Sequence, residues 1–148
     1  MSGLLLHSPA AIVADLLVQL GLGIDFDSSG DWKVFISGEP PDPDRIITVF
    51  DDPGRDSGRT HPQGVRLEHH GIRIQIRADT HAVGYPKARA IAVALDTTVY
   101  QETVTIDGTV YQVHSISRTS DVLALGKDAG SRRNLFSITA IAALFTAP

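Results

Sequence analysis

The sequence contains no cysteine, which excludes disulfide bonds, thiolate metal ligands and a cysteine nucleophile. Small secreted domains are often held together by disulfides, so this absence favours a reducing compartment such as the cytoplasm. Long apolar runs are also missing. The longest lies around residues 138–145, far below the ~18 residues that a membrane-spanning helix needs. The start of the chain has no basic residue and only three consecutive leucines, which is not typical of a signal peptide. We therefore expect a soluble protein.

Basic residues are outnumbered: 13 Lys and Arg face 17 Asp and Glu, which gives a net charge of −4 and a pI of about 5.8. Tight nucleic-acid binding relies on basic side chains that neutralise phosphates, so this balance argues against it. The few aromatic residues (one Trp, three Tyr and five Phe) show no pattern on a basic strand, which also disfavours a nucleic-acid-binding module. The length of 148 residues fits one domain, which we expect to span residues 1–148.

The charges are unevenly distributed along the chain. Residues 25–52 hold eight acids and two bases, a net charge of −6, whereas residues 53–90 hold seven bases and three acids, a net charge of +4. Six of these seven bases are arginine, the cation best suited to bidentate pairing at interfaces. Two interpretations stay open: two solvated surfaces of different charge, or a subunit with complementary faces that packs head to tail.

Helix signals occur twice. Ser8 and Pro9 precede an apolar stripe at helical spacing and Gly21 follows it, so the sequence predicts a helix between them. A second helix is predicted over residues 84–97, with Pro86 near its start and alanines that permit close approach to a sheet.

Alternation of apolar and polar residues predicts the strands. The segments DWKVFISG, RIITVF and GIRIQIRAD each fit a strand. In the last of these the isoleucines face inward and the polar residues outward, the latter being Arg73, Gln75 and Arg77. The segment NLFSITAIAALF predicts a final strand.

A tight turn is predicted at Asp107-Gly108, a strong two-residue hairpin signal. This turn places Ile106 opposite Thr109, and the apolar pattern on both sides agrees with that register.

The order of these elements favours an α+β fold. Since most links are hairpin-like, we expect a mostly antiparallel β-sheet of four to five strands with two helices packed on one face. The prolines of EPPDPD and the polar segment LGKDAGSRR predict connections. A flexible loop is expected at about residues 51–64, where charge, glycine and proline are concentrated.

Residues suited to catalysis or metal binding are present, but not in a recognisable arrangement. No histidine pair has the spacing that brings two imidazoles onto one metal ion, and the adjacent His69 and His70 would point to opposite faces of a strand. The aspartate-rich loops miss the spacing of an EF-hand, and neither a GxSxG nor a GxxxxGK[ST] motif occurs. Paired carboxylates that meet only in space stay open. We therefore expect no catalytic residue, no cofactor site and no metal site.

Six segments follow one another in an order that covers most of the chain. They are a short helix ending in GLG, then DRIITVFDDPG, GIRIQIRAD, YPKARAIAVAL, IDGTVYQVHSI and LGKDAGSRRNLFSITAIAAL. In this order they resemble the tail terminator (minor capsid or tail completion) proteins of long-tailed bacteriophages. Thr139 in the last strand and the pair Arg132-Arg133 depart from the family pattern.

The resemblance implies a structural protein and no catalysis. It implies an α+β subunit that forms a homo-oligomeric, hexameric ring at the head-proximal end of the tail in the virion, after assembly in the host cytoplasm. The ring would contact the tail-tube protein and the head–tail connector protein, and DNA would pass through its lumen without specific binding; no membrane is involved. A ring repeats one head-to-tail contact and needs two different patches on each subunit.

The candidate interface residues are charged and lie in or beside the predicted loop: Asp51, Asp52, Arg55, Arg59, Arg73 and Arg77. Loops longer than about 12 residues are usually functional or disordered, so residues 51–63 are a candidate docking element. Two arginines on the next strand, Arg73 and Arg77, are expected to meet Asp51 or Asp52 across the ring interface. The alternatives are a plain hairpin connection and a solvated strand face.

Two other functions stay open. A head-completion or stopper protein of the same junction can have a similar size and acidity. A small metal-dependent hydrolase would use His61, His69 or His70 with nearby aspartates.

Overall fold

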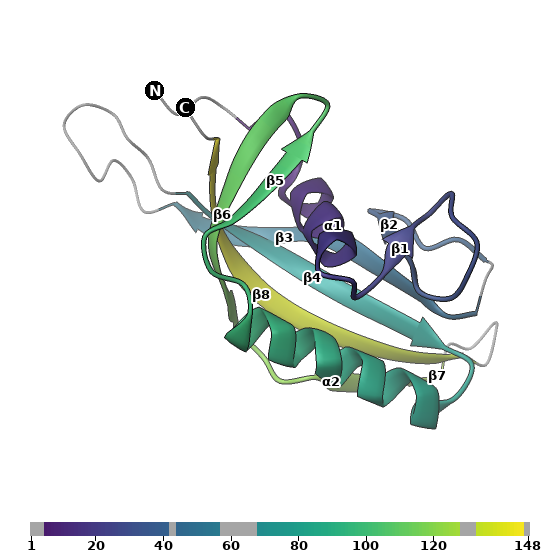
Figure 1. Cartoon of the computed structure of the whole chain (residues 1–148). Helices are drawn as coiled ribbons and strands as arrows, with labels where there is room; N and C mark the ends of the chain where they lie inside the picture. Colours follow the sequence, from purple (N-terminus) through teal and green to yellow (C-terminus); the bar gives the residue numbers. More distant parts are fainter. Residues whose placement is uncertain (1–4, 42–43, 57–67, 128–132, 147–148) are drawn as a thin grey trace, which may run out of the picture.

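The computed structural model describes residues 5–41, 44–56, 68–127 and 133–146 (Figure 1). Within these ranges the chain forms two helices and eight strands, so the expected count of four to five strands was wrong. The elements are α1 (Pro9–Gln19), β1 (Ile24–Asp25), β2 (Lys33–Ile36), β3 (Ile46–Asp56), β4 (Glu68–Ala78), α2 (His81–Thr97), β5 (Glu102–Ile106), β6 (Thr109–Arg118), β7 (Leu123–Lys127) and β8 (Asn134–Thr146).

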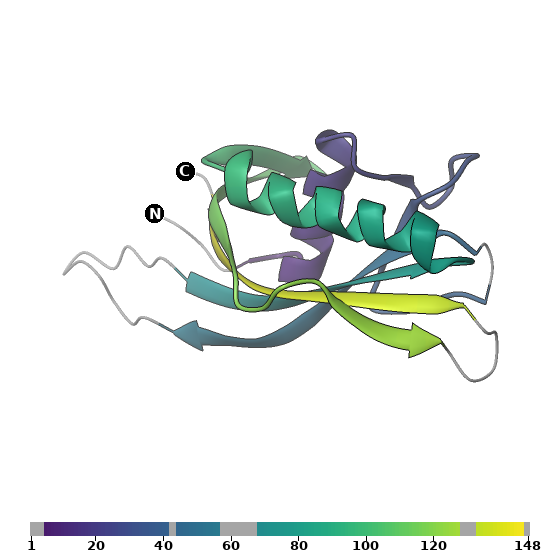
Figure 2. The ribbon, with the colours of Figure 1, turned by 90° about the horizontal axis from the view of Figure 1, so that it is seen from below.

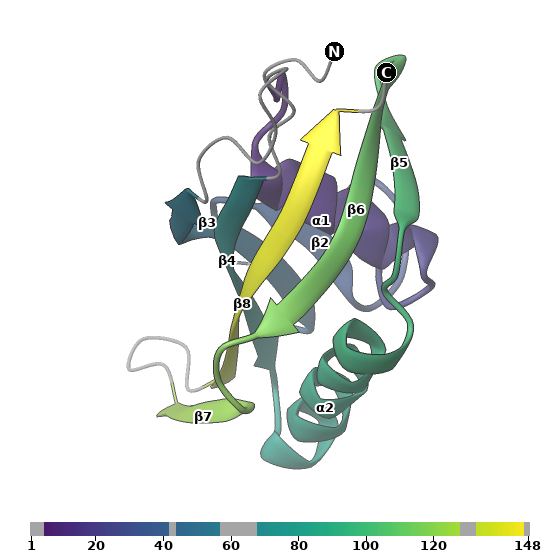
Figure 3. The ribbon, with the colours of Figure 1, turned by 90° about the vertical axis from the view of Figure 1, so that its left-hand side faces the viewer.

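All eight strands belong to one curled sheet with the order β1-β2-β3-β4-β8-β6-β5. The pairings β1–β2 and β2–β3 are parallel, and the others are antiparallel. The long strand β8 pairs with β4 on one side, and β6 and β7 share its other side at different heights, as Figure 3 shows. The mostly antiparallel sheet was therefore expected, whereas the parallel edge was not.

Both helices lie on the same side of the sheet, as expected (Figure 2). Helix α1 begins after Ser8, whose hydroxyl accepts a hydrogen bond from the amide of Ala11, and Gly21 follows it with a φ of +78°. Helix α2 begins three residues earlier than predicted, because Thr80 supplies the N-cap by accepting a hydrogen bond from the amide of Val83. Gly84 then lets α2 approach the sheet closely.

The core lies between the helices and the sheet face that they cover. Its central rows are formed by Ile74 and Ile76 of β4, which are fully buried and pair with apolar residues of β3 and β8. Phe136 of β8 is fully buried beneath α2, and a Cβ atom added to Gly84 would lie 2.4 Å from its ring. The hairpin register around Asp107-Gly108 is confirmed, since Ile106 pairs with Thr109.

Two predicted connections are partly strand. β3 continues to Asp56, so residues 51–56 pair with β4 across a register shift instead of starting a loop. Residues 57–67 lie outside the described residues. The segment predicted as a connection from Leu125 begins within β7, which pairs with the start of β8.

Candidate functional site

The sheet face opposite the helices, called the helix-free face, carries polar residues on its central strands. The register places them in rows across β3, β4 and β8, because side chains alternate between the two faces of a strand. One row contains Phe50, Arg73 and Thr139, and the next contains Thr48, Gln75 and Ser137.

Arg73 is a cation without a counter-ion on this face. Among the six arginines whose side chains the structure describes, it alone has no carboxylate within ion-pair distance. Its guanidinium carbon lies 4.5 Å from the centre of the Phe50 ring, a cation–π contact. Its Nε is buried and has no acceptor in the described part of the chain. The remaining donors of such a half-buried guanidinium suit a carboxylate or phosphate group from another molecule.

Arg77 lies on the predicted face of β4, but the expectation that it is exposed was wrong. Its side chain is only 4% exposed, and its Nη1 donates to Glu39 at 3.3 Å. The amide of Gln75 donates to the same carboxylate at 2.6 Å. The segment after β2 therefore folds over this end of the helix-free face, and its Glu39 pairs with Arg77 within the subunit.

Asp51 and Asp52 are neighbours with different environments, because they point to opposite faces of β3. The carboxylate of Asp51 accepts a hydrogen bond from the amide of Ala10 at 3.0 Å, in the first turn of α1. Anionic groups are favourable at that end of a helix, so Asp51 stabilises the helix start. Asp52 is exposed on the helix-free face and has no partner among the described residues.

The remaining two predicted interface residues are less well defined by the structure. Arg55 belongs to the last part of β3, but its side chain is not among those described. Arg59 lies outside the described residues.

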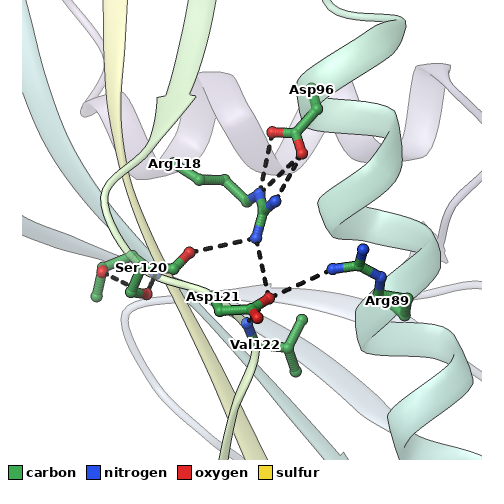
Figure 4. Close-up of polar contacts among 7 residues, drawn as sticks. Arg89, Asp96, Arg118, Ser120, Asp121 and Val122 are labelled. Carbon is green, nitrogen blue, oxygen red and sulfur yellow. Dashed lines mark hydrogen bonds and ion pairs between the residues drawn. The ribbon is translucent and has the colours of Figure 1, made fainter.

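A second charged cluster joins α2 to the end of β6 and the segment after it (Figure 4). Arg118 donates to Asp96 through Nε and Nη2, the shorter contact being 2.6 Å, and its Nη1 lies 3.4 Å from Asp121. Arg89 reaches Asp121 at 3.3 Å. Two arginines and two aspartates thus neutralise one another around a shallow depression of about 450 Å³.

The electrostatics of this cluster follow from its hydrogen bonds. The bond from Arg118 lowers the pKa of Asp96, and the amide of Val122 is the main cause of the lowered pKa of Asp121. The hydrogen bond with Asp96 is the main cause of the raised pKa of Arg118, and Asp121 adds to it. Because every charge is matched inside the subunit, the cluster braces α2 against the sheet. Sequence reasoning missed it, since Arg118 and Asp96 are 22 positions apart and belong to different elements.

The residues named for a metal-dependent hydrolase do not converge in the described part of the chain. His69 and His70 pair with successive residues of β8 and so point to opposite faces, while His61 is outside the described residues. No group of three or more potential metal ligands forms among the described residues. In those same ranges, no helix combines the length and apolar character needed to cross a bilayer.

Comparison with known proteins gives only distant likenesses. No protein family model matches the sequence, and no curated protein matches it significantly. Among solved structures, the chain is similar to one from the virion of a native gene transfer agent particle, with 15% identity, a TM-score of 0.44, and coverage of 77% of this chain and 78% of that one. A second solved chain has 12% identity and a TM-score of 0.40, covering 78% of this chain and 79% of that one. Likenesses at this level do not assign a function.

Proposed function

We propose that this chain is a structural virion protein, a tail terminator that forms a ring on the phage tail tube and joins it to the head connector. The observation that carries the proposal is the unused charge on the helix-free face, Arg73 above all. In the described ranges this half-buried guanidinium has an aromatic ring but no carboxylate beside it, and a buried charge without a counter-ion is costly unless another molecule supplies one. A face of this kind is suited to binding another molecule.

The shape of the β3–β4 hairpin supports a docking role. Both strands extend past the helices at one end (Figure 2), and the predicted docking residue Arg55 belongs to this extension. The hairpin is therefore the element that we propose to contact the tail-tube protein. DNA would pass through the ring without specific binding, in keeping with the acidic chain.

The register changes how Arg73 is expected to act. Arg73 pairs with Phe50, and Asp52 lies two residues further along the same face of β3. Because the two charges are close neighbours, a pairing between Arg73 of one copy and Asp52 of another would be reciprocal, as in a two-fold contact. A head-to-tail ring needs patches that lie apart. We therefore assign Arg73 to a carboxylate on a docking partner, and the ring contact to other residues.

The experiment is a deletion of residues 55–59 with binding to the tail-tube protein and to the portal-side ring as readouts. The deletion shortens β3 by its last two residues, Arg55 and Asp56, and the variant is expected to keep the rest of its fold and to lose its ability to join tubes. Normal tail completion by the variant would contradict the docking role. Binding of the wild type to the portal-side ring, with none to tail-tube protein, would favour a stopper protein over a terminator.

A further inference from the structure

Two edges of the sheet lie at opposite ends of one row of paired residues. The row starts at Asp25 in β1, passes through β2, β3 and β4, reaches Phe136 in β8 and ends at Ala124 in β7. With strands spaced by about 4.8 Å, five spacings separate the two ends by roughly 24 Å along the sheet. In the described part of the chain, β1 pairs only with β2, and β7 pairs only with β8.

The first edge carries an apolar groove with an acidic side. The groove has a volume of about 200 Å³ and lies between α1 and the β1–β2 edge; its lining includes Ala11, Asp15, Val18, Asp25, Phe26 and Ile36. Phe26 is 63% exposed and Ile36 is 48% exposed. The volume is below the ~300–1,000 Å³ typical of small-molecule sites, so the groove suits protruding side chains better than a free ligand.

Charge also marks this groove. Burial raises the pKa of Asp15, and the nearby carboxylate of Asp25 raises it further. A basic group placed beside these two carboxylates would relieve that repulsion. The groove therefore fits an occupant that combines apolar side chains with a cation.

The opposite edge of the sheet combines exposed apolar side chains with a cation. All five residues of β7 are exposed, and its two leucines, Leu123 and Leu125, are 57% and 49% exposed. Lys127 follows on the same strand and has no ion-pair partner in the described ranges. Two protruding leucines beside a lysine are an unusual edge for an isolated subunit, because exposed apolar strand edges invite association.

We propose that Leu123 and Leu125 of one subunit pack into the groove beside α1 and β2 of the next subunit, with Lys127 facing Asp15 and Asp25. The occupant is a second copy of this chain. The contact is heterologous, since one edge meets a different edge about a sheet width away, and repeating it closes a ring or grows a filament. This inference rests on the proposed function, because it supplies the head-to-tail contact of the proposed ring.

The test mixes two variants that each lose one patch. The edge variant is Leu123→Asp/Leu125→Asp, the groove variant is Phe26→Asp/Ile36→Asp, and Val93→Asp on α2 is the control, since Val93 is 45% exposed and lies on neither patch. Native mass spectrometry is expected to show each double variant as a monomer and the control as the wild-type oligomer. An equimolar mixture of the two double variants should form dimers and nothing larger, because only one intact pair of patches remains.

Two results would overturn this contact alone: a wild-type-like ring formed by either double variant, or a mixture that stays monomeric while the wild type forms rings. A wild type that forms no oligomer would instead remove the ring and this contact together. A second measurement uses the cysteine-free chain: the Ile36→Cys/Leu125→Cys variant should give a ladder of disulfide-linked oligomers under oxidation, and each single variant at most a dimer. Monomers alone in the double variant would contradict the contact.

Discussion

Arg118 and Arg73 lie on the same sheet but are used differently. Arg118 holds Asp96 at 2.6 Å and Asp121 at 3.4 Å, in a cluster where each charge is matched (Figure 4). Arg73 has an aromatic ring and no carboxylate in the described part of the chain. The first arrangement joins a helix to the sheet, whereas the second leaves donors for another molecule. We therefore propose that the charge of Arg118 serves the fold and that the charge of Arg73 serves assembly.

The largest expected effect is a loss of folding stability, which should differ between two adjacent apolar residues on opposite faces of the sheet. Phe136→Ala removes a ring that is fully buried under α2 and should lower the free energy of unfolding by about 3–5 kcal/mol. Leu135→Ala, on the half-buried helix-free face, should cost less than about 2 kcal/mol, because less apolar area returns to water. Urea denaturation of both variants measures the difference. Equal losses would show that apolar residues on the helix-free face contribute as much to stability as those on the helix-covered face.

The next effect concerns assembly. Arg73→Glu should weaken binding of the protein to its proposed tail-tube partner at least about tenfold, because the new carboxylate would repel the carboxylate that we propose Arg73 to contact. Its thermal midpoint should fall less than that of Arg118→Met, since among the described residues Arg73 loses its contact with Phe50 but no ion pair. Arg118→Met is the matched control and should show the reverse: a lower thermal midpoint and unchanged assembly. Unchanged assembly of Arg73→Glu at physiological salt would contradict the role of this face.

The neighbours Asp51 and Asp52 provide a second comparison between a charge that serves the fold and an exposed one, with smaller expected losses of stability. Asp51→Ala should cost about 1 kcal/mol of stability, because the first turn of α1 loses an acceptor for the amide of Ala10. Asp52→Ala should leave stability within about 0.5 kcal/mol, as is usual for exposed residues without specific contacts. Chemical denaturation compares them, and a larger loss for Asp52→Ala would reverse the assignment of the two faces.

The smallest effect is a pH dependence. The hydrogen bond from Arg118 holds the pKa of Asp96 below its value in the unfolded chain, near 3.9. The stability that this contact contributes is therefore present above that pH and lost as pH falls through the folded-state pKa. Asp96→Asn should flatten the acid limb of the stability curve below about pH 4, measured as free energies of unfolding at several pH values.

Asp15→Asn is a control that is expected to change stability in the opposite direction. Burial and Asp25 raise the pKa of Asp15, so its charged form opposes folding above that pKa, and the amide should stabilise the subunit at neutral pH. An acid limb of unchanged slope in Asp96→Asn would show that the Arg118 contact contributes little.

Local signals predicted the parts of the fold that depend on nearby residues. Ser8 and Gly21 set the ends of α1, and the turn at Asp107-Gly108 set a hairpin register, because caps and two-residue turns are decided within a few positions. The isoleucine alternation in β4 likewise identified the core face.

Other features depend on residues far apart in sequence, and these were missed. Arg77 is buried by Glu39, and Asp51 is held by the start of α1, at separations of 38 and 41 positions. The short strands β1 and β7 gave too weak a pattern to predict, and β2 was predicted as a strand but not as part of a parallel edge. Which charges stay unpaired is a property of the folded chain, so the candidate site was only partly predictable.

The central claim is that the subunit closes into a ring through two unlike patches. Native mass spectrometry of the purified wild-type protein, over a range of concentrations and with and without magnesium, tests it most directly. We expect the spectra to show one closed species near six subunits. A monomer at every concentration, or an open series of oligomers without a preferred size, would contradict it.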